Sequence, residues 1–268
     1  MASLGSSAQR EAAFFSAAAS GDVEGIIAAL AAGQDARALS PETSHGGGRL
    51  TALMIASKGG HTGAAVALVA ADPGLVPLAD AHGVTACHLA CLFGRAEVLG
   101  LLLDASPALA EARTADDGKA PLHCACQAAD PGGSAACVAL LLSRGASADA
   151  RDASGGTPLM AASAAGRLAT VRLLAEPPHG ADLDAVDGDG DSALAHGGGG
   201  GHGEVVAYLL ARGASCDFYT AALVGQAASV AAALEAGQDA NATDDDGCTA
   251  LMGAAAKGHV EVKKGPGF

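Results

Sequence analysis

The sequence predicts an all-α solenoid of stacked helix-turn-helix repeats, and two observations support this. A phrase recurs in register: Thr, then Ala or Pro, an apolar residue, and an Ala-rich run that ends in Gly-His or Gly-Arg. It occupies residues 51–61, 85–95, 157–167 and 249–259. The composition agrees, because 50% of residues are apolar but only 3% are aromatic and tryptophan is absent. Such a core of Ala, Leu and Val suits thin helices that pack on their neighbours.

The repeat length follows from one apolar position that lies seven residues before the glycine ending the first helix. This position is held by Phe14, Leu53, Cys87, Leu122, Leu159, Leu194, Phe218 and Leu251. Most intervals are 33 to 39 residues, but the interval from Leu194 to Phe218 is 24. We therefore predict about eight repeats, of which the seventh lacks its leading turn. Extra residues fall in turn-type sequence at 42–47, 128–131 and 177–178, where insertions cost only loop-closure entropy.

Each full repeat reads as a turn, a helix, a loop and a second helix. The turns begin with Asp and end with Gly, as in residues 80–83 and 152–155. Helix starts are predicted at N-cap threonines and at prolines in the first helical position; these are Thr51, Thr85, Thr157, Thr249, Pro121 and Pro158. Helix ends are predicted at glycines suited to the left-handed conformation, namely Gly33, Gly145, Gly213 and Gly237.

The repeats are predicted to span residues 11–264, with disordered segments at 1–10 and 265–268. The last repeat begins its second helix at Val260, but no Leu pair follows, and Gly265 to Gly267 would stop a helix. We therefore expect this repeat to be incomplete.

The pattern resembles the ankyrin repeat, whose signature is Thr-Pro-Leu-His. Residues 85–88 keep Thr and His, residues 120–123 keep Pro, Leu and His, and residues 157–160 lose the His. The resemblance covers nearly the whole chain. It implies short β-turn fingers, and it implies that a protein partner binds a concave face made by the finger tips and the first helices.

Within that resemblance, the register gives candidate protein-binding residues at finger tips and exposed first-helix positions: Ile55, Lys58, His82, Leu89, Leu92, Phe93, Lys119 and Gln127. Cys124 and Ala128 hold equivalent exposed positions. Leu89, Leu92 and Phe93 are large and apolar where solvent favours polar groups, which is typical of an interaction site. Alternatively, these side chains are covered by the insertion at 128–131.

Charge limits the classes of partner. The net charge is −14, which argues against nucleic acids and anionic membranes as partners. No run of 18 apolar residues exists, so no membrane span is expected. The seven cysteines indicate reduced thiols in an unsecreted chain. We expect a cytoplasmic or nuclear monomer that carries no cofactor.

Six soft ligands on two adjacent first helices raise the possibility of a metal or redox site: Cys87, His88, Cys91, His123, Cys124 and Cys126. A structural role is favoured, because Cys91 and Cys126 occupy the position of Ser57 in another repeat, and zinc-site spacings are missing. The resemblance also implies that both histidines are structural. No catalytic serine or phosphate-loop motif occurs, so no enzyme activity is expected.

Two unusual stretches fall in the sixth and eighth repeats. Asp187 to Asp191 is similar to the start of a calcium loop, but Ser192 and Gly198 stand at its sixth and twelfth positions. We interpret it, and Asp244 to Asp246, as solvated turns. Glycines 197–201 are expected to interrupt the first helix of the sixth repeat and to weaken the stack, either as a hinge or as a tolerated defect.

The leading hypothesis is a non-enzymatic scaffold or adaptor that binds a partner protein through its concave face. An alternative is a regulatory or targeting region truncated from a larger enzyme, ligase or channel. A Cys/His metal or redox sensor is the third interpretation.

Overall fold

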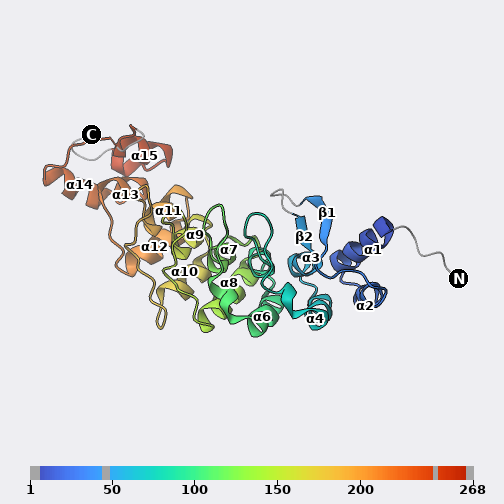
Figure 1. The fold of residues 1–268 in the computed structure, drawn as a ribbon. Coiled ribbons are helices and arrows are strands. Elements are labelled where there is room, and N and C mark those ends of the chain that lie inside the picture. Colours follow the sequence, from blue (N-terminus) through green and yellow to red (C-terminus); the bar gives the residue numbers. More distant parts are fainter. Residues whose placement is uncertain (1–6, 44–48, 244–246, 264–268) are drawn as a thin grey trace. The chain divides into compact units, whose positions relative to one another are not determined.

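The computed structural model describes residues 7–43, 49–243 and 247–263. It divides into two compact parts, residues 1–153 and 154–268, which we call the N-terminal block and the C-terminal block. Paired helices dominate both blocks (Figure 1). The prediction of an all-α repeat fold is confirmed.

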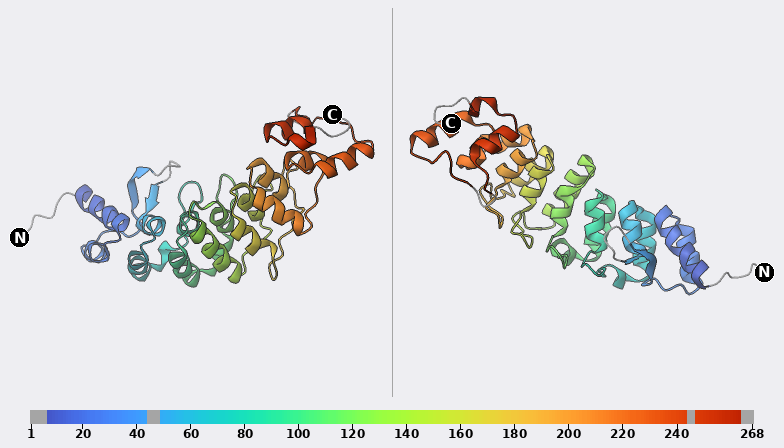
Figure 2. Two further views of the ribbon diagram at one scale, coloured as in Figure 1. Left: turned by 180° about the vertical axis from the view of Figure 1, so that it is seen from behind. Right: turned by 90° about the horizontal axis from the view of Figure 1, so that it is seen from above.

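The described residues of the N-terminal block contain four helix pairs. The first helices α1, α3, α5 and α7 pack on one another in succession, and so do the second helices α2, α4, α6 and α8 (Figure 2). Its elements are α1 (Ser7–Ser20), α2 (Val23–Ala31), β1 (Leu39–Thr43), β2 (Arg49–Thr51), α3 (Ala52–Gly59), α4 (Thr62–Ala71), η1 (Pro73–Leu75), α5 (Ala86–Leu92), α6 (Ala96–Ala105), η2 (Pro107–Glu111), α7 (Pro121–Gln127) and α8 (Pro131–Ser143). Fully buried side chains such as Phe14, Leu53 and Leu99 form its core.

The C-terminal block continues the same scheme. Its first helices α9, α11, α13 and α15 pack in succession, and α10 contacts α12 as α14 contacts α16. Its elements are α9 (Pro158–Ala164), α10 (Leu168–Ala175), α11 (Ala193–Gly199), α12 (Gly203–Ala211), α13 (Phe218–Leu223), α14 (Ala227–Glu235), α15 (Ala250–Ala256) and α16 (Val260–Lys263). Without a leading turn, α13 is capped by Asp217, whose Oδ1 accepts the N–H of Thr220 at 2.7 Å.

Helix starts largely follow the sequence prediction. Thr51, Thr157 and Thr249 each accept the N–H of the residue three positions later at 3.3 Å. Thr85 is also the N-cap residue, of α5, but its hydroxyl lies 2.9 Å from Nδ1 of His88. Pro121 and Pro158 occupy the first helical turn as predicted.

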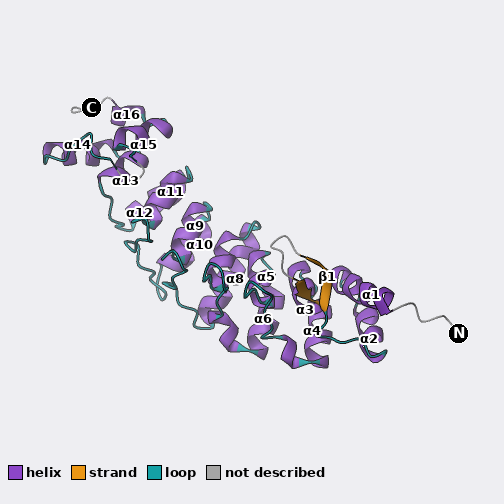
Figure 3. Cartoon of the chain, turned by 45° about the horizontal axis from the view of Figure 1, so that its top comes forward, coloured by secondary structure: helices purple, strands orange, loops and turns teal. Residues whose placement is uncertain are grey.

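The fingers are short, as the resemblance implied. Isolated bridges join Ala79 to Thr85, Val186 to Ser192 and Thr243 to Thr249. In the second repeat the insertion lengthens the finger into the antiparallel pair β1 and β2 beside α3 (Figure 3).

The edges of the repeat region differ in part from expectation. Helix α1 begins at Ser7, so residues 7–10 are helical, where disorder was predicted. Helix α16 begins at Val260 as expected. Residues 1–6, 265–268 and 244–246, with the predictions made for them, lie outside the described residues.

The glycine run does not interrupt the first helix of the sixth repeat, which corrects the sequence prediction. Helix α11 extends through Gly199, and Gly201, with φ of 74°, ends the turn that follows. Gly197 and Gly198 are buried, and a Cβ at Gly198 would lie 2.5 Å from Cγ1 of Val224. The close approach of α13 therefore accounts for a glycine at 198, whereas a Cβ at Gly199 would meet nothing within 4 Å.

At four positions, a basic residue that follows the helix-ending glycine joins its repeat to the one before. Nε2 of His61, His202 and His259 lies 2.8, 2.9 and 2.9 Å from a carbonyl oxygen near the end of the preceding first helix. Arg95 acts in the same position, because its Nε donates to the carbonyl of Lys58 at 3.2 Å. Each side chain thus pairs a helix-end carbonyl that has no partner within its own helix.

The glycine of the preceding repeat makes room for that side chain. Gly21 has φ of 76°, which disfavours other residues, and a Cβ there would lie 2.6 Å from Nδ1 of His61. Gly166 is related to His202 in the same way, at 2.4 Å. The recurring glycine therefore has two roles: it adopts the positive φ that ends its own helix, and it leaves space for the basic side chain of the next repeat.

We predict that His61→Ala lowers the free energy of unfolding by about 0.5–1.5 kcal/mol, the usual net contribution of one hydrogen bond. The matched control is His61→Arg, which supplies the donor used at Arg95 and should retain most of the stability. Urea denaturation of the three proteins measures the difference. An equal loss in the Arg variant would contradict the proposed contact.

We also predict that Gly199→Ala raises the free energy of unfolding by about 0.5–1 kcal/mol, because alanine is the better helix former. Gly198→Ala should show no such gain, because its methyl group would meet Val224. Denaturation, with amide exchange of residues 193–199 as a second readout, distinguishes the two. A gain in both variants would show that the space at Gly198 is not restrictive.

Candidate functional site: a groove on the N-terminal block

A groove with a volume of about 430 Å³ lies between the fingers and the first helices of the second, third and fourth repeats. It brings together seven of the eight predicted residues, namely Lys58, His82, Leu89, Leu92, Phe93, Lys119 and Gln127. Ile55 is half-buried on α3 and does not line it. The remaining lining residues are Leu50, Asp80, Val84, His88, Thr114, Asp116, Asp117 and Cys124.

The apolar floor of the groove is open to solvent. Leu92 is 38% exposed and Phe93 is 36% exposed, and both lie at the end of α5. The insertion at 128–131 does not cover them, because Asp130 caps α8 by accepting the N–H groups of Gly132 and Gly133. The interpretation of a covered patch is therefore wrong for Leu92 and Phe93, while Leu89 is half-buried.

Two neighbouring positions differ from the register prediction. Ala128 is fully buried and Cys124 is nearly so. Helix α7 ends at Gln127. Of the three first-helix positions expected to be exposed in the fourth repeat, only Gln127 has an exposed side chain.

Lys58 partly shields the aromatic ring of the floor. Its Nζ lies 5.3 Å from the centroid of Phe93, within the range of a cation–π interaction. This contact crosses from α3 to the end of α5.

The rim of the groove consists of two fingers that are bonded to each other. Nδ1 of His82 lies 2.6 Å from Oδ2 of Asp116, and the N–H of Ala115 donates to the carbonyl of His82 at 2.7 Å. Oδ1 of Asp80 accepts the N–H groups of His82 and Val84, each at 2.9 Å. The third finger is thus closed by its own aspartate and tied to the fourth.

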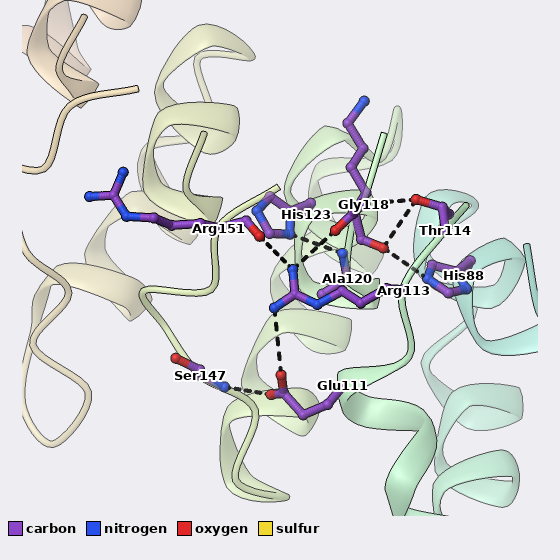
Figure 4. A network of polar contacts seen from close by, with 10 residues as sticks. His88, Glu111, Arg113, Thr114, Gly118, Ala120, His123, Ser147 and Arg151 are labelled. Carbon is purple, nitrogen blue, oxygen red and sulfur yellow. Dashed lines mark hydrogen bonds and ion pairs between the residues drawn. The ribbon is translucent and has the colours of Figure 1, made fainter. Parts of the chain in front are cut away.

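The fourth finger, which includes Thr114 and Gly118 (Figure 4), is held by contacts of Lys119. The Lys119 carbonyl accepts the N–H of Thr114 at 3.1 Å and lies 3.1 Å from Nε2 of His88. The ammonium lies 2.9 Å from Oδ2 of Asp117, and this hydrogen bond raises the pKa of Lys119 above its ordinary value. Burial acts to raise the pKa of Asp117, but the hydrogen bonds from Thr114 and Lys119 hold it below its ordinary value.

Arg113 anchors the base of the same finger. Its Nη1 donates to the carbonyl of Gly118 at 3.0 Å and to the carbonyl of Arg151 at 2.7 Å (Figure 4). Glu111 accepts the N–H of Ser147 at 2.9 Å. The finger is therefore held from both neighbouring repeats.

His88 is a buried structural residue. Nδ1 accepts the N–H of Thr85 at 3.2 Å while Nε2 faces the Lys119 carbonyl, which fits a neutral ring with its proton on Nε2. Burial lowers the pKa of His88, against a weaker opposing effect of hydrogen bonds and of Asp117 and Asp80. His123 accepts the N–H of Ala120 in the same way at 3.2 Å.

Five of the seven cysteines lie in the core, while Cys216 is half-buried and Cys248 is exposed. Cys87, Cys91, Cys124, Cys126 and Cys137 are all buried. Burial raises the pKa of Cys91 and Cys126, and it raises that of Cys124 to about 12. The thiolate, which is the reactive and metal-binding form, is therefore disfavoured at these three positions. Within the described residues, no group of three or more His, Cys, Asp or Glu is placed to hold a metal ion.

Asp187 organises the acidic turn of the sixth repeat. Its Oδ1 accepts the N–H groups of Asp189 and Asp191 at 3.1 and 3.0 Å, and its Oδ2 lies 2.8 Å from Nε2 of His196. Burial acts to raise the pKa of Asp187, but these hydrogen bonds, with His196 first, lower it overall. The carboxylate closes a turn as Asp80 does, and the His196 contact was not foreseen.

The comparison with known families agrees with this geometry. A sequence profile described as ankyrin repeats (3 copies) matches residues 14–112, 78–152 and 122–220. The chain belongs to the ankyrin repeat family. Ankyrin repeats are generally protein–protein interaction modules. Among the residues described for this ankyrin-repeat chain, no helix combines the length and apolarity needed to cross a membrane.

We predict that burial of His88 makes the N-terminal block less stable in acid. Because the folded pKa lies below the unfolded value of about 6.5, the unfolded chain takes up more protons as the pH falls below that value. The stability is complete above about 6.5 and is lost as the pH falls towards the folded pKa. Denaturation at about pH 7.5 and about pH 5.5 should show a smaller acid loss for His88→Gln than for the wild type. Equal losses would show that His88 does not contribute.

Proposed function

We propose that this ankyrin-repeat protein is a non-enzymatic scaffold that binds a partner protein in the groove of the N-terminal block. The observation that supports it most is the apolar floor, in which Leu92 and Phe93 are exposed beside the half-buried Leu89 within a frame of bonded fingers. Contiguous exposed apolar surface that is rimmed by polar groups usually marks an interaction site.

The groove is suited to binding because its frame is already ordered. The contacts of His82 with Asp116 and of Arg113 with Gly118 and Arg151 fix both fingers before any partner arrives. A rigid surface loses little conformational entropy on association, so modest contacts suffice. An aromatic residue at the centre of a framed patch is also the usual kind of hot spot.

The polar groups near the groove support recognition rather than catalysis. Asp80 and His88 are engaged in hydrogen bonds that hold the fingers, and the thiol of Cys124 is held in its protonated form. We propose the same groove whether the chain acts alone as an adaptor or as the regulatory or targeting region of a larger enzyme, ligase or channel.

The test is affinity capture with the wild type and Phe93→Asp. The charged side chain should abolish partner capture, because a carboxylate in the apolar floor would have to be desolvated on binding. The melting curve should stay within error of the wild type, since Phe93 is 36% exposed.

Val66→Asp is the matched control. Val66 is 47% exposed on α4, in the layer of second helices, and does not line the groove. This variant should capture the same partners as the wild type. The proposed function would be contradicted if Phe93→Asp captured partners as well as the wild type does, or if both variants lost capture.

A further inference from the structure

The groove has an acidic rim beside its apolar floor. Asp80, Asp116 and Asp117 line it from the third and fourth fingers. The side chains of Asp116 and Asp117 remain 67% and 51% exposed although each makes an ion-pair contact. Both carboxylates are therefore open to a cation that approaches from solvent.

The positive charges of the groove are already engaged. The Lys119 ammonium lies 2.9 Å from Asp117, and the Lys58 ammonium lies over the ring of Phe93. His82 contacts Asp116 through Oδ2, so a neutral imidazole there leaves the negative charge of the carboxylate in place. The chain as a whole carries a net charge of −14, which adds a long-range attraction for cationic partners.

We infer that the groove binds a segment of a partner protein in which an apolar side chain is flanked by arginine or lysine. The apolar side chain would lie on Leu89, Leu92 and Phe93, and the cation would pair with Asp116 and Asp117. Arginine suits this rim best, since its planar guanidinium can donate two parallel hydrogen bonds to one carboxylate. This inference rests on the proposed function and specifies the chemistry of its partner.

An anionic segment fits the groove poorly. It would face three aspartates, and like charges brought together across an interface disfavour binding. To reach an ammonium it would also have to displace Asp117 from Lys119 or Phe93 from Lys58.

The test uses three labelled synthetic peptides and fluorescence anisotropy with the full chain. The first peptide has a Leu-Leu centre flanked by arginines, the second replaces the arginines with glutamates, and the third replaces the leucines with serines. The arginine peptide should bind at least about tenfold more tightly than either of the others at low salt. Its affinity should fall as the ionic strength rises from about 50 mM to about 300 mM, because exposed charges are screened.

Asp116→Asn tests the assignment of the cation site, and it keeps the shape of the side chain beside His82. It should weaken the arginine peptide several-fold and should not weaken the glutamate peptide, which has no cation to pair with Asp116. Asp104→Asn is the matched control, because Asp104 lies on α6, is equally exposed at 67% and pairs with Arg144 outside the groove. It should bind the arginine peptide like the wild type.

Three results would overturn the inference: tighter or equal binding of the glutamate peptide, no measurable binding of the arginine peptide, or equal effects of Asp116→Asn and Asp104→Asn. These failures differ from failure of the proposed function. Capture that is lost in Phe93→Asp without any preference for the arginine peptide leaves the groove as the binding site and removes only its charge preference.

Discussion

The structure depends on one contact that the second, third, sixth and eighth repeats make with the repeat before them. A histidine or arginine at the start of the second helix reaches back to a carbonyl at the end of the preceding first helix, as His61 does to Ala19 and Arg95 does to Lys58. The side chain passes over a glycine with positive φ, which leaves the space for it. Because this contact ties the second repeat to the first and the third to the second, it also helps to align α3 and α5, which contribute Lys58, Leu89 and Leu92 to the groove.

The fourth repeat departs from this rule, and the departure shapes the groove. Gly133 stands where other repeats bring a basic side chain, and a Cβ on it would lie 2.5 Å from the carbonyl oxygen of Gly94. The backbones at Gly94 and Gly133 therefore lie close together, while Asp130 caps α8 by accepting the N–H of Gly133. The insertion at 128–131 thus provides the N-cap and first residue of α8, and Phe93 remains 36% exposed.

Much of the fold could be predicted from the sequence, because the repeated phrase encodes local structure. Thr51 and Pro158 mark helix starts whatever surrounds them, and the register brought Leu89, Leu92 and Phe93 to one surface. The errors arose where contacts between repeats decide the outcome. The Thr85 hydroxyl contacts His88, and Ala128 is buried. Gly198 leaves space for Val224 within an intact helix. The contacts of Lys58 with Phe93 and of His82 with Asp116 also join different repeats, so no local pattern reveals them. The recurring Gly-His, by contrast, was visible in the sequence and indicated a structural role that recurs along the chain.

The central claim is that a partner protein is recognised by the pre-formed groove of the N-terminal block. Hydrogen exchange of the full chain, measured alone and with the partner recovered by capture, tests it most directly. Binding should slow exchange at residues 82–93 and 114–127, which form the fingers and first helices of the groove, and leave α4 and α6 unchanged. Slowed exchange confined to the second helices or to the C-terminal block would contradict the account.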